Sequence, residues 1–253
     1  MFTRDSVTII TATTGHRFLN RCLKSIQDQT FPRREHLVVS DGLDHRDKDK
    51  VDQTIATLIE IRNGVSVLSL PYPTGKEGWC GHRIYAAMSL LANAEFVCFL
   101  DDDNWFEPDH IASLVEGIQA DKAPWGFSLR KIFDAEGNFV AADNCESLGN
   151  LHPVFLNEAD RLIDTNCYLL RREVAVACAP IWYRPALAIG GLPADRTVTQ
   201  FLLRAFPNPH CTRRHTVNYT AGSNSNSVKP DYFVMGNRRM QQRYPNGLPC
   251  EVG

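Results

Sequence analysis

Five consecutive apolar residues run directly into three consecutive aspartates in the first half of the chain. The apolar residues are 96–100 (FVCFL), and Asp101, Asp102 and Asp103 follow them. An uninterrupted apolar run of this length is typical of a strand buried on both faces, as in a parallel sheet covered by helices. Adjacent carboxylates repel one another, so a folded protein keeps such a cluster mainly where a cation neutralises it. This stretch alone fits a metal site and a solvated acidic turn equally well. Along an extended backbone, Asp101 and Asp103 would point to one side and Asp102 to the other.

Strand-like and helix-like patterns alternate before that stretch. Such alternation predicts right-handed crossovers and a mostly parallel sheet flanked by helices, in an α/β fold. Ligands of such sheets bind beyond the carboxyl ends of the strands, where Thr11–Thr13, Asp41 and Asp101–Asp103 all lie. The expected strands are residues 7–13, 36–40, 65–70 and 96–100, and the expected helices lie in residues 18–31, 51–61 and 82–91.

The pattern loosens after Asp109, where a mixed subregion is expected. No internal repeat and no linker rich in Pro, Gly or Ser is visible, so we expect one domain over residues 1–253. The expected helices are residues 110–118, a helix opening at 171–173, and 197–205; the expected strands are 126–132, 138–142, 162–170 and 215–219; residues 223–227 are expected to form a loop.

The composition is that of a soluble globular protein, with 43% hydrophobic and 22% charged residues. A formal net charge of -2 argues against a nucleic-acid partner. No apolar run approaches a transmembrane span, and the N-terminus does not read as a signal peptide. The eight cysteines form no Cys-x-x-Cys pair, which favours free thiols in a reducing compartment. We therefore expect a cytoplasmic protein, and leave peripheral membrane association and the oligomeric state open.

Two common phosphate-binding motifs are absent from the sequence. No Gly-x-Gly-x-x-Gly follows the first strand, and no Gly-x-x-x-x-Gly-Lys-Ser/Thr occurs anywhere. A phosphorylated ligand would therefore be held in another way. A divalent cation bound to the carboxylates would hold the phosphates, because such a cation bridges phosphate oxygens with few protein ligands.

Six short motifs are spread along the chain between residues 11 and 196. They are TATTGHR at 11–17, CLKSIQDQTF at 22–31, SDG at 40–42, GHRIYAA at 81–87, FLDDDNWFEPDHI at 99–111 and ADR at 194–196. Together they resemble the family 2 glycosyltransferases, which have the GT-A fold. The resemblance implies a nucleotide-sugar-binding half at 1–109 and an acceptor-side half at 110–253.

The resemblance also implies roles for residues that would bind the donor. Asp41 would accept a hydrogen bond from uracil, Arg83 would neutralise nucleotide charge, and Asp102 would contact the ribose. Asp103 would bind the Mn²⁺ or Mg²⁺ that spans the diphosphate. The extended alternation puts Asp101 on the same side as Asp103, so Asp101 would reach this metal through water. The other expected donor-binding residues are Thr11, Ala12, Thr13, Arg17 and Lys76.

On the acceptor side, the resemblance makes Asp195 the catalytic base. Asp164 and Trp105 are expected to face the acceptor, and His215 to complete the metal site. The family's usual Glu-Asp pair is Ala194-Asp195 here, and the preceding Gly190-Gly191 pair is closer than expected. Asp195 would also suit the N-cap of the helix that follows it.

The function expected from the resemblance is metal-dependent, inverting transfer of a sugar from a nucleotide-diphosphate donor to a glycan or other hydroxyl acceptor. UDP is the preferred nucleotide, with dTDP and GDP left open. A sugar-phosphate nucleotidyltransferase would need a glycine-rich loop after the first strand, where this chain has one glycine, Gly15. An aspartyl phosphatase would carry its aspartates after the first strand. A non-catalytic sugar-nucleotide or glycan-binding module would be expected to have lost the acidic cluster.

Overall fold

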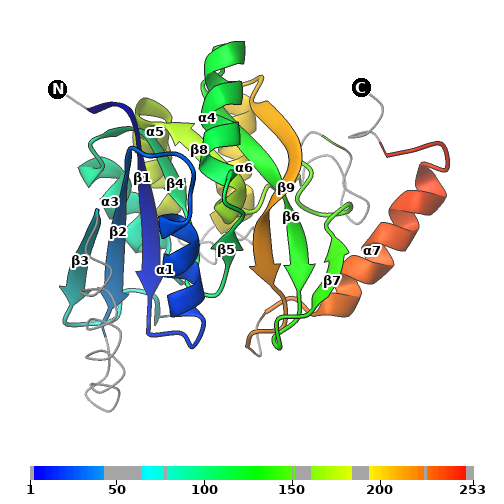
Figure 1. Cartoon of the computed structure of the whole chain (residues 1–253), viewed down its shortest axis with the longest axis horizontal. Coiled ribbons are helices and arrows are strands. Elements are labelled where there is room, and N and C mark those ends of the chain that lie inside the picture. The colour runs from blue at the N-terminus through cyan, green and yellow to red at the C-terminus, as the bar shows by residue number, and fades with distance from the viewer. Residues whose placement is uncertain are drawn as a thin grey trace.

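The computed structural model describes residues 3–42, 64–76, 79–149, 151, 161–183, 194–224 and 227–248. In this part of the chain, nine strands form one continuous sheet with helices on both faces (Figure 1). The strand order is β3-β2-β1-β4-β8-β6-β9-β5, and β7 pairs with β6. The helix expected at 51–61 and the Gly190-Gly191 pair lie outside the described residues.

The first half of the sheet is parallel, as the alternating pattern predicted. β1 pairs in parallel with β2 and β4, and β2 pairs in parallel with β3. The run 96–100 is fully buried, with 0% exposure at all five residues, which confirms a strand covered on both faces. The elements of this half are β1 (Thr3–Thr13), α1 (Leu19–Gln27), β2 (Arg34–Asp41), β3 (Val65–Leu70), α3 (His82–Leu91) and β4 (Ala94–Phe99).

The second half of the sheet is mixed, which confirms the expected subregion. β8 lies antiparallel between β4 and β6, and β9 runs parallel to β6. The short β5 closes the far edge against β9. The elements of this half are β5 (Trp105–Phe106), α4 (His110–Asp121), β6 (Trp125–Phe133), β7 (Phe139–Ala142), β8 (Tyr168–Arg171), α5 (Arg172–Trp182), α6 (Ala194–Ala205), β9 (His210–Thr220) and α7 (Pro230–Arg243).

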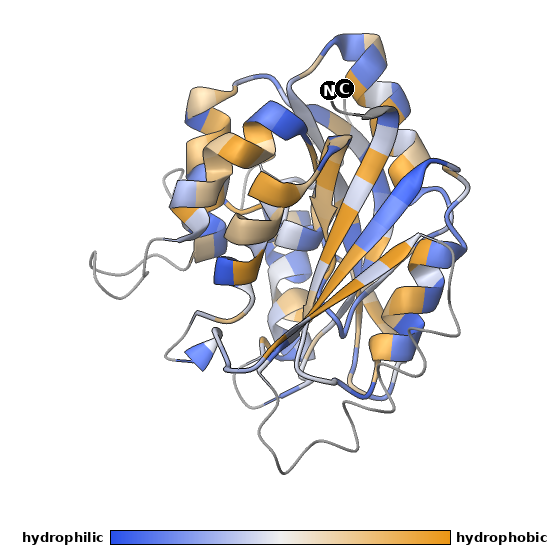
Figure 2. Ribbon diagram, turned by 90° about the vertical axis from the view of Figure 1, so that its left-hand side faces the viewer, coloured by the Kyte–Doolittle hydropathy of each residue, from blue (hydrophilic) through white to orange (hydrophobic). Residues whose placement is uncertain are grey.

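The helices form two layers. Helices α3, α5 and α6 cover one face, with α5 in contact with both of the others, while α1 and α4 lie on the opposite face (Figure 1). Figure 2 shows the sheet between helices on both sides, with hydrophobic residues frequent along its strands. Among the described helices, none is long and apolar enough to cross a membrane.

Two expectations about local structure were wrong, and one helix was not expected. The strand expected at 162–170 is shorter, because the Asp164 side chain accepts a hydrogen bond from the Asn166 amide and caps the 3-10 turn η4 (Thr165–Cys167) before β8 begins. The extended alternation expected for Asp101–Asp103 does not occur, because β4 ends at Phe99 and the Asn104 amide closes a turn onto the Asp101 carbonyl at 3.1 Å. Helix α7 was not expected, although Pro230 at its first turn is a known start signal.

Candidate functional site

A polar cavity of about 910 Å³ opens at the carboxyl ends of β1, β2 and β4. Six aspartates line it, and Lys76 is the one lysine or arginine among the described lining residues. The aspartates are Asp41, Asp101, Asp102, Asp103, Asp164 and Asp195.

The sheet topology explains why residues so far apart in sequence meet here. The carboxyl ends of the parallel strands β1, β2 and β4 share one edge of the sheet. Because β8 is antiparallel to β4, Asp164 reaches the same edge from the start of η4. The first turn of α6 brings Asp195, and the end of β9 brings Tyr219.

The acidic turn, Asp101–Asp103, is held by uncharged groups. The Tyr85 hydroxyl donates to one oxygen of Asp101, and the Asn166 side-chain amide donates to the other at 2.8 Å. The Thr13 hydroxyl donates to Asp102 at 2.5 Å. The hydrogen bonds to Asp101 and Asp102 therefore come from uncharged groups. Asp103 is near the positive groups of His16 and Arg21, and Arg21 donates to its backbone carbonyl at 3.1 Å, but no described ion pair joins the Asp103 carboxylate to a cation.

The pKa values of the acidic turn reflect this lack of compensation. Burial raises the pKa of Asp101 to about 6, helped by the neighbouring charges of Asp103 and Asp164. Burial, reinforced by the charge of Asp101, also raises the pKa of Asp102 to about 6. Burial raises the pKa of Asp103 above its ordinary value as well. The turn stores unfavourable charge that a bound cation would relieve.

Asp41 shapes the neighbouring wall of the cavity. One of its oxygens accepts from the Thr74 amide at 2.7 Å and the Thr74 hydroxyl at 2.8 Å, and the other accepts from the Gly75 amide at 2.9 Å. Gly42 lies so close to Pro73 that a Cβ would come within 1.9 Å of the Pro73 nitrogen. Asp41 thus holds the loop that carries Lys76 against the end of β2. The Asp41 oxygen that accepts from Gly75 has one further lone pair.

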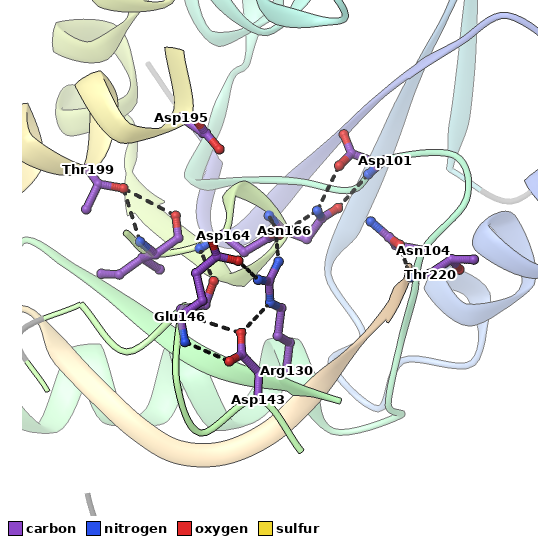
Figure 3. A network of polar contacts seen from close by, with 12 residues as sticks. Asp101, Asn104, Arg130, Asp143, Glu146, Asp164, Asn166, Asp195, Thr199 and Thr220 are labelled. Carbon is purple, nitrogen blue, oxygen red and sulfur yellow. Dashed lines mark hydrogen bonds and ion pairs between the residues drawn. The ribbon is translucent and has the colours of Figure 1, made fainter. Parts of the chain in front are cut away.

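A second acidic group, the Arg130 cluster, lies beside the cavity and consists of Arg130, Asp143, Glu146 and Asp164. The Arg130 guanidinium pairs with all three carboxylates: with Asp143 and Glu146 at 2.8 Å each, and with Asp164 (Figure 3). Although burial favours its neutral form, these carboxylates raise the pKa of Arg130 well above its ordinary value. Against the cost of burial, Arg130 lowers the pKa of Asp143.

Asp195 lies in the first turn of α6 and faces the same cavity. One of its oxygens accepts from the Arg196 amide at 2.7 Å. Burial raises the pKa of Asp195, and the charge of Asp164 adds to the effect. Since α6 begins at Ala194, Asp195 is inside the first turn rather than at the expected N-cap.

Nine of the expected site residues line the cavity. They are Ala12, Thr13, Asp41, Lys76, Asp101, Asp102, Asp103, Asp164 and Asp195. The expected strand ends of the first half of the chain therefore converge, and the second half adds Asp164 and Asp195 to the same cavity.

Three of the expected donor-side residues lie outside the cavity lining. Thr11 is buried below it, where its hydroxyl bonds the His36 ring at 2.9 Å. Arg17 donates to the Ala135 carbonyl at 2.8 Å on the surface. Arg83 lines a separate apolar groove of about 560 Å³, because one residue of helix turns it away from His82, which does face the cavity.

Trp105 and His215 also lie outside the lining. The Trp105 ring stacks beneath the Arg21 guanidinium at 3.6 Å and against Phe133 at 4.6 Å. The His215 ring approaches the Asn144 side chain at 3.3 Å. His215 follows a register shift in the pairing of β9 with β6, and its partner on β6 is Leu129.

Sequence reasoning missed several polar residues in and around the cavity. Tyr85 and Tyr219 line it, and Asn166 and Arg130 hold its carboxylates. Arg130 had a recognisable signal, because a charged residue within the apolar strand pattern of 126–132 requires buried partners. Asn166 had none, since only the fold brings it to Asp101.

The donor set was compared with what a divalent cation requires. No group of three or more His, Cys, Asp or Glu side chains within the described ranges is arranged to hold a metal by itself. Mg²⁺ and similar ions need fewer protein ligands where substrate phosphates complete the shell, and use one or two carboxylates there. The acidic turn fits that second kind of site, with Asp103 facing the cavity.

Comparison with known proteins adds a family match and a set of similar structures. The family model "Glycosyl transferase family 2" matches residues 6–175. A comparison with curated proteins gives no match. The structure of S. aureus TarS residues 1–349 in complex with UDP has a TM-score of 0.61 at 16% identity, covering 96% of this chain and 66% of that one.

Two further structures have the same kind of similarity. The TarS complex with UDP-GlcNAc has a TM-score of 0.59 at 17% identity, covering 96% of this chain and 67% of that one. The mannosyltransferase PcManGT from Pyrobaculum calidifontis, in complex with GDP-Man and Mn²⁺, has a TM-score of 0.51 at 14% identity, covering 98% of this chain and 66% of that one. The chain thus spans about two thirds of the length of these structures, and at these identities the similarity concerns the fold.

Proposed function

The chain belongs to glycosyl transferase family 2, and from this premise we propose that it is a metal-dependent, inverting glycosyltransferase with a UDP-sugar donor and a hydroxyl acceptor. The observation that carries the proposal is the charge of the cavity, where six aspartates meet one lysine among the described lining residues. A diphosphate would be repelled from such a cavity unless a cation entered with it.

The acidic turn is the best place for that cation. Asp103 would hold Mn²⁺ or Mg²⁺, because both oxygens of Asp101 are already bonded, by Tyr85 and Asn166, and Asp102 is bonded by Thr13. The side-chain donor on Asp103 is the hydroxyl of Ser223, which also lines the cavity. The ion would act as a Lewis acid on the leaving diphosphate. The solved complexes that share the fold contain UDP, UDP-GlcNAc, or GDP-Man with Mn²⁺, which supports a nucleotide-sugar ligand.

Other residues that line the cavity would contact the sugar-nucleotide donor. The free lone pair of Asp41 would accept the ring N–H of a uracil base, Ala12 and Thr13 would form the floor beside it, and Lys76 would approach the phosphates. A guanine or thymine ring also presents an N–H, so Asp41 by itself does not select UDP. The UDP preference is supported by the TarS complexes and is tested below.

Asp195 would be the general base. Its carboxylate takes the proton of the acceptor hydroxyl while that oxygen forms a bond to the anomeric carbon, and the bond from that carbon to the diphosphate oxygen breaks. Attack from the side opposite the leaving group inverts the configuration. The raised pKa of Asp195 suits this role, because a general base works best when its pKa approaches the ambient pH.

The test is release of nucleoside diphosphate from a panel of UDP-, dTDP- and GDP-sugars with Mn²⁺, for wild type and Asp195→Asn. A positioned general base contributes about 10²–10⁴-fold, so turnover of Asp195→Asn should fall by that factor. Its affinity for UDP with Mn²⁺, measured by calorimetry, should stay within about 2-fold, because the diphosphate contacts are intact.

Asp231→Asn is the matched control. Asp231 is also a first-turn carboxylate of a helix, but it lies on α7 and outside the cavity lining. It should keep full turnover. Wild-type turnover in Asp195→Asn would refute the assignment of the base, and binding of UDP with no turnover of any sugar nucleotide would favour a binding module over an enzyme.

A further inference from the structure

We propose that Asn166 is a positioning residue that fixes the carboxylate of Asp101 against that of Asp164, and so sets the donor side of the cavity against the acceptor side. This inference rests on the proposed glycosyl transfer. Asn166 is 1% exposed and lies in η4, between two aspartates that both line the cavity.

The Asn166 side chain makes three of its four possible hydrogen bonds to these two residues. Its oxygen accepts from the Asp101 backbone amide at 2.6 Å. Its nitrogen donates to the Asp101 carboxylate at 2.8 Å and to the Asp164 carboxylate at 2.7 Å (Figure 3). One side chain thus holds both the backbone and the carboxylate of Asp101, across 65 residues of sequence.

The chemistry of the three partners admits only this orientation of the amide. Two carboxylates need donors, and one backbone N–H needs an acceptor. A flipped amide would place its oxygen against both carboxylates and its NH₂ against the N–H of Asp101. An aspartate at position 166 would have the same shape but no donor, and would add a third negative charge.

The outer oxygens of the two carboxylates are held as well. The Tyr85 hydroxyl donates to Asp101, and the Arg130 guanidinium donates to Asp164. A continuous chain of hydrogen bonds therefore runs from Tyr85 on α3 through Asn166 to Arg130 on β6. Tyr85 is also part of the hydrophobic core, and Arg130 also pairs with Asp143 and Glu146. The described hydrogen bonds of the Asn166 side chain all go to Asp101 and Asp164.

Such a link should matter more for turnover than for binding. The two carboxylates are neighbours in the cavity lining, one in the acidic turn on the proposed donor side and one on the proposed acceptor side, and a misplacement of about 1 Å can cost about 10²-fold in rate. The Asn166 side chain makes no described contact with Asp41 or Asp103, the residues proposed to bind the nucleotide and the metal. Substitution of such a residue should lower kcat and leave the KM for the donor nearly unchanged.

The test compares Asn166→Asp, which keeps the shape, and Asn166→Ala, which removes the group, with Asn237→Ala. The Asn237 side chain also bridges two backbone groups, the Ala142 carbonyl at 2.7 Å and the Asn144 amide at 3.1 Å, but it lies on α7 outside the cavity lining. For each variant, kcat and KM are measured with the sugar nucleotide that the wild-type protein turns over, together with the UDP affinity in Mn²⁺ and the melting temperature.

Both Asn166 variants should lose about 100-fold in kcat, with KM and UDP affinity within about 3-fold of wild type. Asn237→Ala should lose melting temperature but not kcat. Unchanged kcat in Asn166→Asp, or a loss that appears in KM alone, would overturn the inference and leave the proposed function standing. A wild-type protein that neither binds UDP nor turns over any sugar nucleotide would overturn both.

Discussion

The acidic turn and the Arg130 cluster each gather three carboxylates in the folded protein, and they neutralise them differently. In the Arg130 cluster one buried guanidinium pairs with all three, and Arg196 adds a second cation against Glu146 at 3.0 Å. In the acidic turn the partners are hydroxyls and an amide. The pKa of Asp143 is lowered despite burial, whereas those of Asp101 and Asp102 rise to about 6. Within the Arg130 cluster the pKa of Glu146 is also raised, because burial outweighs the charges of Arg130 and Arg196.

The difference separates a structural cluster from a ligand site. Buried carboxylates are tolerated where charge is balanced, and the Arg130 cluster supplies its balance from the chain itself. The acidic turn holds its carboxylates in place with neutral donors, and none of the described ion pairs involves them. A cation from solution would complete it, which is why the turn rather than the cluster is the proposed metal site.

Removal of the guanidinium should produce the largest effect. Arg130→Met leaves buried carboxylates without a cation, and breaking a buried ion pair in this way costs about 3–5 kcal/mol of unfolding free energy. Urea denaturation measures it. Arg33→Met is the control, because Arg33 makes an exposed pair with Asp5 at 3.0 Å and should cost about 1 kcal/mol or less. Equal losses in the two variants would remove the distinction between the cluster and an ordinary ion pair.

Removal of a charge from the acidic turn should not lower the free energy of unfolding. Asp103→Asn should leave the metal-free protein as stable as wild type or slightly more so, because it relieves repulsion. It should weaken UDP binding in Mn²⁺ by about 10- to 100-fold, which corresponds to about 1.4–2.8 kcal/mol. The control is Asp109→Asn, which removes a carboxylate paired with Arg214 outside the cavity lining. A destabilised apo protein with unchanged UDP affinity would make Asp103 a structural residue.

The third expected effect is a change of stability with pH. Because the folded-state pKa of Asp101 is raised from 3.8 to about 6, the folded protein binds more protons than the unfolded chain in this window, and Asp101 costs stability as pH rises through it. Asp101→Asn should therefore gain about 1–3 kcal/mol relative to wild type between pH 4 and pH 7 in metal-free buffer. Urea denaturation at each pH measures the difference, from which the contributions of the buried histidines cancel.

Asp143→Asn gives the contrasting pH profile. The folded-state pKa of Asp143 lies below 3.8, so the stability it contributes is present above that value and is lost only as pH falls below it. Its destabilisation should stay nearly constant from pH 4 to pH 7. A flat profile for Asp101→Asn as well would show that the two acidic groups do not differ in charge balance.

The sequence predicted the parallel half of the sheet well and the mixed half less well. Strand ends 11–13, 41 and 101–103 were identified correctly because they follow apolar runs whose burial depends on local pattern alone. The 3-10 turn before β8 was missed, because it depends on the Asp164 side chain accepting a hydrogen bond from the backbone amide of Asn166. The contact of Asn166 with Asp101 depends on tertiary packing. The position of Arg83 outside the cavity depends on which face of α3 it occupies, and a motif match specifies neither.

The most direct measurement is a calorimetric titration of UDP into the wild-type protein with Mn²⁺ and, separately, with EDTA. If the acidic turn requires a cation before it accepts a diphosphate, the affinity with Mn²⁺ should exceed that in EDTA by about 100-fold or more, or about 2.7 kcal/mol. Equal affinity in the two buffers would contradict the account, because it would mean that the chain neutralises the acidic turn without help from a metal.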